Sequence, residues 1–207
     1  MAFDGITIAA MVSELNKNLS GGRINKIAQP ESDELLITGK GANGQKRLLL
    51  SASASLPLIY FTGKNRISPL TAPNFCMLLR KHIGSARITA IRQPGLERVV
   101  EFELEHLNEL GDVCHKVLIM ELMGKHSNII FCDDNNMILD SIKHVSCNVS
   151  SVREVLPGRP YFIPHTPDKL DPLTISREDF MEKVCGRSNA VSKALYQTLT
   201  GFSPVMA

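Results

Sequence analysis

The chain has 207 residues, of which 43% are hydrophobic and 21% are charged, and its formal net charge at pH 7 is +2. This length can bury the core of one or two globular domains, and no apolar run approaches the roughly 20 residues that span a bilayer. The N-terminus lacks the basic stretch that opens a signal peptide, and the small net charge does not by itself indicate nucleic-acid binding. We therefore expect a globular protein with no membrane partner.

A helix is predicted at the start of the chain, because apolar residues recur at helical spacing after Thr7, the expected N-cap. Gly21-Gly22 ends this helix, since glycine readily adopts the left-handed conformation of a helix end. Asn43-Gly44 is a strong turn signal between two strands. The strand-like segments in this part of the chain are residues 23–29, 34–38, 47–50 and 56–61.

A second helix is predicted over residues 71–83, with Thr71 as its cap and Gly84 just beyond its end. Arg80 and Lys81 lie in its last turn, where the helix dipole favours cations by about 0.3–1 kcal/mol. They are candidate phosphate contacts, although the dipole alone would account for them.

The second half of the chain predicts further strands and then helices. Apolar and acidic side chains alternate over residues 97–104, which indicates a half-buried strand, and residues 113–123 are apolar enough for a central strand. Frequent prolines over residues 156–172 predict an extended linker with little regular structure. The other predicted strands and helices are residues 86–92, 129–132, 137–142, 176–184 and 189–199.

These elements together predict an α+β fold. An antiparallel, sandwich-like β-sheet domain with two helices is expected over residues 1–172. Residues 173–207 are expected to begin a separate helical domain.

The most informative segment is residues 121–128, where Gly-Lys-His-Ser interrupts two strongly apolar runs. It predicts a hairpin whose tip presents Lys125 and His126. The stretch looks superficially like the end of a phosphate loop, but it lacks the upstream glycine and joins two strands instead of opening a helix. The sequence also lacks the Gly-x-Ser-x-Gly, His-Glu-x-x-His and Walker motifs, so we expect a binding protein and not an enzyme.

Basic residues gather ahead of this segment. Between residues 60 and 98 the only carboxylate is Glu97, whereas acidic residues dominate from 101 to 112. This asymmetry permits a basic face for phosphates, and it also fits charges that simply solvate a surface.

Cysteine and histidine spacing gives no sign of a metal site. The five cysteines are odd in number and include no Cys-x-x-Cys pair, which is typical of free thiols in a reducing compartment. No two histidines have the close spacing of zinc ligands. We expect a cytoplasmic protein without a metal.

Several sequence blocks together resemble the NFACT family, also called fibronectin-binding protein A-like proteins. They cover nearly the whole chain in the family's order: Phe3-Asp4-Gly5, residues 22–30, 74–82, 121–128 and 156–161, and Gly201-Phe202-Ser203-Pro204. The resemblance implies that residues 1–172 form the NFACT N-terminal domain, similar in fold to the N-terminal domain of formamidopyrimidine-DNA glycosylases. It also implies that residues 173–207 open a truncated helix-hairpin-helix domain.

The family resemblance also implies a function. Bacterial members act in ribosome-associated quality control: they bind large ribosomal subunits obstructed by peptidyl-tRNA and recruit alanyl-tRNA to add an alanine tail to the stalled chain. The N-terminal domain helps to grip the tRNA, without a cofactor, through an Asp-Arg pair and a Glu-Ile-Met triplet. In this sequence the corresponding residues are Glu97-Arg98 and Glu121-Leu122-Met123.

These candidate contacts can be weighed on physical grounds. In an extended strand Glu97 and Arg98 would point to opposite faces, so we expect Arg98 to contact RNA and Glu97 to orient it or accept from a base edge. Glu121 either pairs with a nearby Arg or Lys or contacts RNA directly, because burying it unpaired would be costly. Leu122 and Met123 are by default core residues. Lys125 and His126 are by default turn residues, and for these two we favour contact with phosphates.

Two other functions remain open. A glycosylase-like enzyme would need the N-terminal proline and adjacent glutamate of that class, whereas this chain begins Met1-Ala2-Phe3. A fibronectin-binding adhesin, the role in the family's older name, would need export to the cell surface, for which the sequence gives no signal.

Overall fold

The computed structural model describes residues 3–164 and 169–207. The strands of this part of the chain are β1 (Arg23–Ala28), β2 (Glu34–Gly41), β3 (Gly44–Ser51), β4 (Leu58–Phe61), β5 (Arg87–Arg92), β6 (Val99–Leu107), β7 (Val113–Glu121), β8 (Asn128–Asp133) and β9 (Ile138–Ser141). Its helices are α1 (Gly5–Leu19), α2 (Asn74–Ile83), the 3-10 turn η1 (Gly124–His126), α3 (Arg177–Phe180), the π-helical turn η2 (Met181–Cys185) and α4 (Val191–Thr198).

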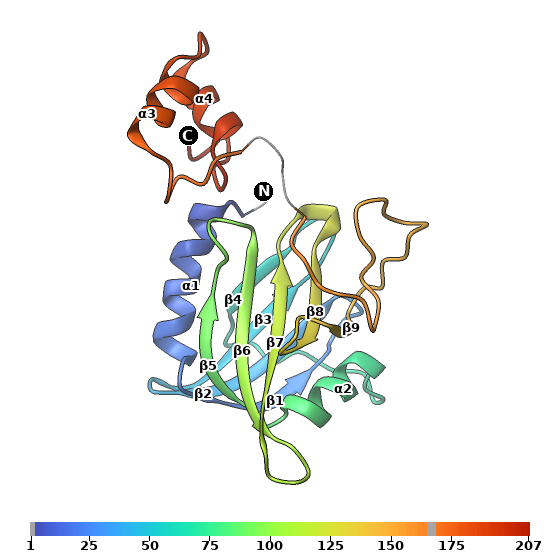
Figure 1. The fold of residues 1–207 in the computed structure, drawn as a ribbon. Helices are drawn as coiled ribbons and strands as arrows, with labels where there is room; N and C mark the ends of the chain where they lie inside the picture. Colours follow the sequence, from blue (N-terminus) through green and yellow to red (C-terminus); the bar gives the residue numbers. More distant parts are fainter. Residues whose placement is uncertain (1–2, 165–168) are drawn as a thin grey trace.

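All nine strands form one antiparallel sheet in the order β4-β3-β2-β1-β5-β6-β7-β8-β9. The sheet curls, so that β1 to β4 lie behind β5 to β8 in Figure 1. The main core contains Leu35 and Leu50 from one half of the sheet, Phe102 and Phe131 from the other, and Leu15 from α1. The α+β class is as predicted, but in place of a sandwich the structure has one continuous sheet whose two halves share a core.

The two halves of the sheet meet between β1 and β5, at the single residue pair Arg23 and Arg87. Beyond this pair β1 leaves β5, and α2 lies against β1. The Nε of Arg80 on α2 donates a hydrogen bond to the carbonyl oxygen of Ile27 at 2.8 Å. A backbone acceptor left without a strand partner is thereby satisfied, which gives Arg80 a structural role besides any RNA contact.

Both main helices begin elsewhere than predicted. The N-cap of α1 is Asp4 and not Thr7: the Asp4 carboxylate accepts from the Thr7 backbone N–H at 2.8 Å. Helix α2 begins at Asn74 after Pro73, and Thr71 lies outside it. The reason is steric, because the residue before a proline is pushed out of the helical conformation.

A second, smaller core lies on the other face of β6 to β9. It contains Val99, Ile119 and Ile130 from the sheet and Val155 from a covering segment, residues 145–163, which we call the strap. Paired backbone hydrogen bonds between Val145 and Val155 close the strap on itself. Ile138 on β9 anchors it to the sheet, because its backbone N–H donates to the Arg159 carbonyl at 2.9 Å and its carbonyl accepts from the Gly158 N–H at 2.8 Å. Thus the first part of the proline-rich region predicted as a linker packs on the sheet; residues 165–168 lie outside the described residues.

The C-terminal residues form a separate small cluster around Val184, Ala194 and Leu199. The predicted helix over 176–184 is found as α3 continued by η2, and the one over 189–199 as α4. The domain boundary at residue 172 stays a prediction. In the described part of the chain no helix combines the length and hydropathy that a membrane span requires.

This C-terminal part docks on the start of α1. The backbone N–H of Gly5 donates to the Gly201 carbonyl at 3.0 Å, and the Ser203 hydroxyl donates to Asp4 Oδ2 at 2.6 Å. A Cβ at position 5 would lie 2.0 Å from the Leu96 carbonyl oxygen and 2.7 Å from the Gly201 Cα. Only glycine therefore fits at position 5, and two blocks from opposite ends of the sequence meet there.

Candidate nucleic-acid interface

The two sequence motifs lie side by side in the structure. The backbone N–H of Leu122 donates to the carbonyl oxygen of Arg98 at 2.9 Å, and Glu121 is paired with Val99 across β6 and β7. Glu97 is half-buried and Arg98 is exposed. The sheet register therefore brings residues 97–98 next to residues 121–123. We call these two segments together the Arg98 edge.

Glu97 and Arg98 lie in the turn that precedes β6, and not in a strand as predicted. The Glu97 backbone N–H donates to the Pro94 carbonyl at 3.0 Å and closes this turn. The alternation of side chains along a strand does not apply inside a turn. The strand geometry used to separate the roles of Glu97 and Arg98 is therefore wrong.

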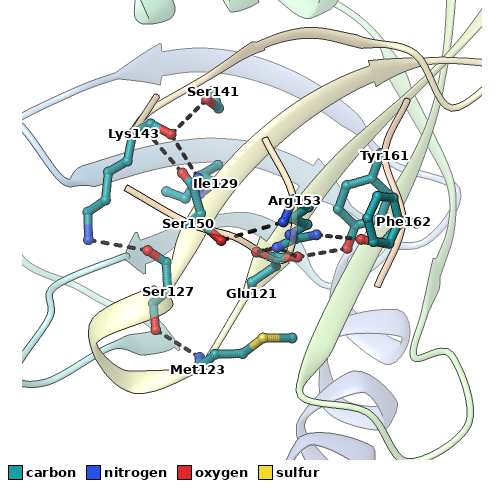
Figure 2. A network of polar contacts seen from close by, with 11 residues as sticks. Glu121, Met123, Ser127, Ile129, Ser141, Lys143, Ser150, Arg153, Tyr161 and Phe162 are labelled. Carbon is teal, nitrogen blue, oxygen red and sulfur yellow. Dashed lines mark hydrogen bonds and ion pairs between the residues drawn. The ribbon is translucent and has the colours of Figure 1, made fainter. Parts of the chain in front are cut away.

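Glu121 is fully buried and forms an ion pair with Arg153 of the strap, which is 9% exposed. The Arg153 Nη2 donates to the two carboxylate oxygens at 2.6 and 2.5 Å, and the Tyr161 hydroxyl donates to Oε1 at 3.0 Å (Figure 2). Two alternatives were open for Glu121, pairing with a nearby Arg or Lys and direct contact with RNA. The structure shows the pairing, with Arg153. Any effect of Glu121 on a bound RNA would be transmitted through its neighbours.

Tyr161 and Arg153 both donate to the Glu121 carboxylate and also contact each other. Burial and the adjacent Glu121 carboxylate raise the pKa of Tyr161 far above its usual range, so its hydroxyl stays protonated and donates. The Arg153 guanidinium carbon lies 5.4 Å from the centre of the Tyr161 ring, and its Nη1 donates to the Phe162 carbonyl at 2.5 Å. The network fastens the strap to the end of β7.

The turn after β7 presents the cationic tip that the sequence predicts. Gly124 has a φ of +60°, and the Ser127 hydroxyl accepts from the Met123 backbone N–H at 2.8 Å. Lys125 and His126 are exposed on η1. Of the other two candidates, Leu122 is buried in the main core and Met123 is half-buried against the second, smaller core.

Lys143 holds the same turn through hydrogen bonds to backbone carbonyl oxygens. Its Nζ donates to the carbonyl oxygens of Ala52 and, at 3.2 Å, of Ser127. Its backbone carbonyl accepts from the side chain of Asn128 at 2.8 Å. Sequence reasoning missed the roles of Lys143 and Arg153, because no local pattern marks the partner of a buried group. The only sequence signal for Tyr161 was its place in the 156–161 block.

A cleft of about 810 Å³ opens beside the Arg98 edge, between the sheet domain and the C-terminal part. Arg98 and Lys169 bring two cations to it, Asp4 and Glu97 bring two carboxylates, and Tyr196 brings an aromatic side chain. Its other lining residues include Leu96, Gly201, Phe202 and Ser203. Cations together with an aromatic ring are the groups that bind phosphates and unpaired bases.

Arg80 and Lys81 are not part of this site. They are exposed on α2, which Figure 1 places at the opposite end of the sheet from the turn between β5 and β6. Within residues 3–164 and 169–207 no group of three His, Cys, Asp or Glu side chains is arranged to hold a metal ion. The site therefore consists of the Arg98 edge, η1 and the adjoining cleft.

The fold and the paired motifs define the class of protein. Residues 4–207 match the family model described as NFACT N-terminal and middle domains, and the chain belongs to this family. It is 40% identical over 210 residues to the Rqc2 homolog RqcH of Bacillus subtilis (strain 168), covering 100% of this chain and 36% of that protein. The Streptococcus suis (strain 05ZYH33) RqcH is 37% identical over 97% of this chain and 36% of its own length. The chain thus spans about a third of the length of these relatives.

Solved structures agree with this assignment. The N-terminal domain of fibronectin-binding protein PavA from Streptococcus pneumoniae superposes with a TM-score of 0.90 at 36% identity, over 99% of this chain and 77% of that chain. The N-terminal part of the fibronectin/fibrinogen-binding protein from Streptococcus suis gives a TM-score of 0.91 at 36% identity over the same shares. The family predicted from the sequence blocks is confirmed.

Proposed function

We propose that this chain is the tRNA- and ribosome-binding N-terminal part of a ribosome-associated quality control factor. The whole protein would bind large subunits obstructed by peptidyl-tRNA and recruit alanyl-tRNA for alanine tailing of the stalled chain. The observation that carries the proposal is the adjacency of Arg98 to residues 121–123 at an exposed edge beside a cleft. The similarity to RqcH proteins supports it.

Each residue of the site takes a distinct role in this proposal. Arg98 contacts a phosphate or stacks on a base, and Glu97 beside it orients the guanidinium or accepts from a base edge. Lys125 and His126 contact phosphates from η1. Glu121 acts indirectly, because its ion pair with Arg153 fixes the end of β7 on which this edge is built.

In this proposal the protein binds and does not catalyse, and it works in the cytoplasm, where ribosomes are found. The motif side chains are positioned by hydrogen bonds and packing, with no metal or cofactor required. The five cysteines, all free in the structure, are compatible with a reducing compartment.

The direct test is sedimentation of the full-length protein with large ribosomal subunits that carry peptidyl-tRNA, followed by sequencing of the bound tRNA. We expect cosedimentation with obstructed subunits and enrichment of tRNA specific for alanine. Empty subunits are the control. Equal recovery with empty subunits, or no enriched tRNA, would contradict the proposal.

The adhesin role is a second candidate, because two structural neighbours carry the names of fibronectin-binding proteins. Surface labelling of intact cells distinguishes the two functions: an adhesin would be labelled, whereas a ribosome factor would be found with the ribosomal fraction. The glycosylase alternative depends on Met1 and Ala2, which lie outside the described residues. Borohydride trapping of a covalent DNA adduct would support that enzyme.

A further inference from the structure

A row of three cations crosses the outer face of the sheet where its two halves meet. Arg23 on β1 lies directly opposite Lys40 on β2 and directly opposite Arg87 on β5, so the three side chains share one face of three adjacent strands. Ile24 and Ile88, the next residues along β1 and β5, point into the main core. Because successive strand residues alternate in direction, the row faces outward, and all three cations are exposed.

The cations of this row form no ion pair among the described residues. Across the residues that the structure describes, no carboxylate lies within ion-pair distance of Lys40, Arg23 or Arg87. Glu105, opposite Arg87 on β6, ends the row without pairing with it. The Arg23 Nη1 is held at the surface by the Ser85 carbonyl, at 3.3 Å. Like charges that face each other across strands repel, and a bound polyanion would relieve this repulsion.

The row continues toward a hollow on β3. Gln45 lies opposite Lys40 and lines a cavity of about 440 Å³ together with Lys46, Arg47 and Phe61. Phe61 is paired with Leu48, whose side chain lies in the main core, so its ring belongs to the inner face of the sheet and not to the face of the row. The three strands thus present a charged track that continues to Gln45 and Arg47 on β3.

We propose that Lys40, Arg23 and Arg87 bind the phosphodiester backbone of the same tRNA that the Arg98 edge contacts. This inference rests on the proposed function and adds a second surface to it. Arg98, just before β6, and Glu105, the neighbour of Arg87 on β6, are seven positions apart, or roughly 23 Å at the rise of an extended strand. A single folded RNA that reaches both surfaces makes its second contact intramolecularly, so a weak row still adds affinity.

The test is a salt titration of tRNA binding by the full-length protein carrying Lys40→Gln, Arg23→Gln and Arg87→Gln together. Each phosphate contact contributes about 0.7–0.9 to the slope of log affinity against log salt concentration. We expect the triple variant to flatten the slope by about 2–3, measured by fluorescence anisotropy with a labelled tRNA transcript. Between 50 and 200 mM salt the affinity of the triple variant should therefore fall about 20- to 40-fold less than that of the unmodified protein.

A matched control removes the same charge elsewhere. Arg177, Arg187 and Lys193 are exposed on the C-terminal part, and their triple replacement by Gln should leave the slope nearly unchanged. An equal loss in this control, or an unchanged slope in the row variant, overturns the proposal. Arg23→Lys with Arg87→Lys keeps the charges and should retain the slope, which separates loss of charge from misfolding.

The outcomes also separate this inference from the function on which it rests. If the unmodified protein binds neither tRNA nor large subunits, both fail. If it binds tRNA and the row variant binds with the same slope, only the row fails. A defect confined to sedimentation with large subunits would assign the row to ribosomal RNA and overturn the assignment to tRNA.

Discussion

The Ser203 hydroxyl donates a hydrogen bond to the Asp4 carboxylate at 2.6 Å, although the two residues are 199 positions apart. Asp4 also accepts from the Thr7 backbone N–H at 2.8 Å, so one carboxylate caps α1 and fastens the C-terminal part. The cleft beside Arg98 is lined by both Asp4 and Ser203. The shape of the candidate RNA site therefore depends on this contact.

Acid should loosen this contact. Burial acts to raise the pKa of Asp4, but hydrogen bonds from Ser203 and Thr7 outweigh it and lower the pKa below its usual value. Because the folded pKa is depressed, the stabilisation is present above the unfolded pKa of about 3.9 and is lost as pH falls through the folded pKa. We expect proteolysis of the C-terminal part to accelerate over that window.

The Asp4→Ala variant should lose the acid-dependent step in proteolysis and lower the free energy of unfolding by about 1 kcal/mol, the usual effect of removing a helix cap. Ser203→Ala should weaken docking while the cap hydrogen bond to Thr7 remains. The exposed Ser192→Ala serves as control. An unchanged pH profile in Asp4→Ala would contradict the assignment.

Arg153→Met should lower the free energy of unfolding by about 3–5 kcal/mol, because it leaves the buried Glu121 carboxylate without its partner. Urea denaturation measures this loss. The double variant Glu121→Leu with Arg153→Met should recover most of it, since no buried charge then remains. Arg159→Met breaks a more exposed pair with Glu154 and should change the free energy by only about 0–1 kcal/mol. Equal effects of the two arginine variants would refute the buried pair.

Arg98→Ala should weaken tRNA binding by about 1–3 kcal/mol without lowering the melting temperature, because the side chain is exposed and packs no core. Anisotropy and thermal unfolding measure the two quantities on the same sample. Arg177→Ala removes an equal charge from α3 and should leave binding unchanged. Full affinity in Arg98→Ala would remove the central residue from the proposed site.

Lys125→Ala should flatten the slope of log affinity against log salt concentration by roughly 0.7–0.9, the effect of one lost phosphate contact. Lys125→Arg keeps the charge and adds a planar fork that can bind a phosphate at two points, so it should bind tRNA at least as tightly. A slope that stays the same in Lys125→Ala would show that η1 does not touch the RNA backbone.

The cysteines should differ sharply in their reactivity toward a thiol reagent at pH 8. Burial, with added repulsion from Asp133, raises the pKa of Cys132 to about 12, so it carries almost no thiolate at this pH. Cys147 and Cys185 are exposed and should react within the folded protein. Cys132 should react only after denaturation; rapid labelling in the native state would mean that the strap opens.

Local patterns in the sequence predicted the individual elements well. The turn signal at Asn43-Gly44 falls between β2 and β3, where Ala42 and Asn43 form the turn and Gly44, with a φ of +85°, begins β3. The alternation predicted from residue 97 corresponds to β6, shifted to Val99–Leu107. Elements of this kind depend on side chains a few positions apart, whose spacing is visible in the sequence.

The sequence alone determined the α+β class, the antiparallel strands, the family and the exposed tip at Lys125 and His126. Tertiary structure decided that Arg153 neutralises Glu121, that Ser203 holds Asp4, and that Arg80 and Lys81 lie far from Arg98. These contacts arise from the curl of the sheet and the path of the strap, which bring together residues that no local pattern links. A helix or strand records its own period in the sequence, whereas the partner of a buried charge is chosen only when distant segments pack.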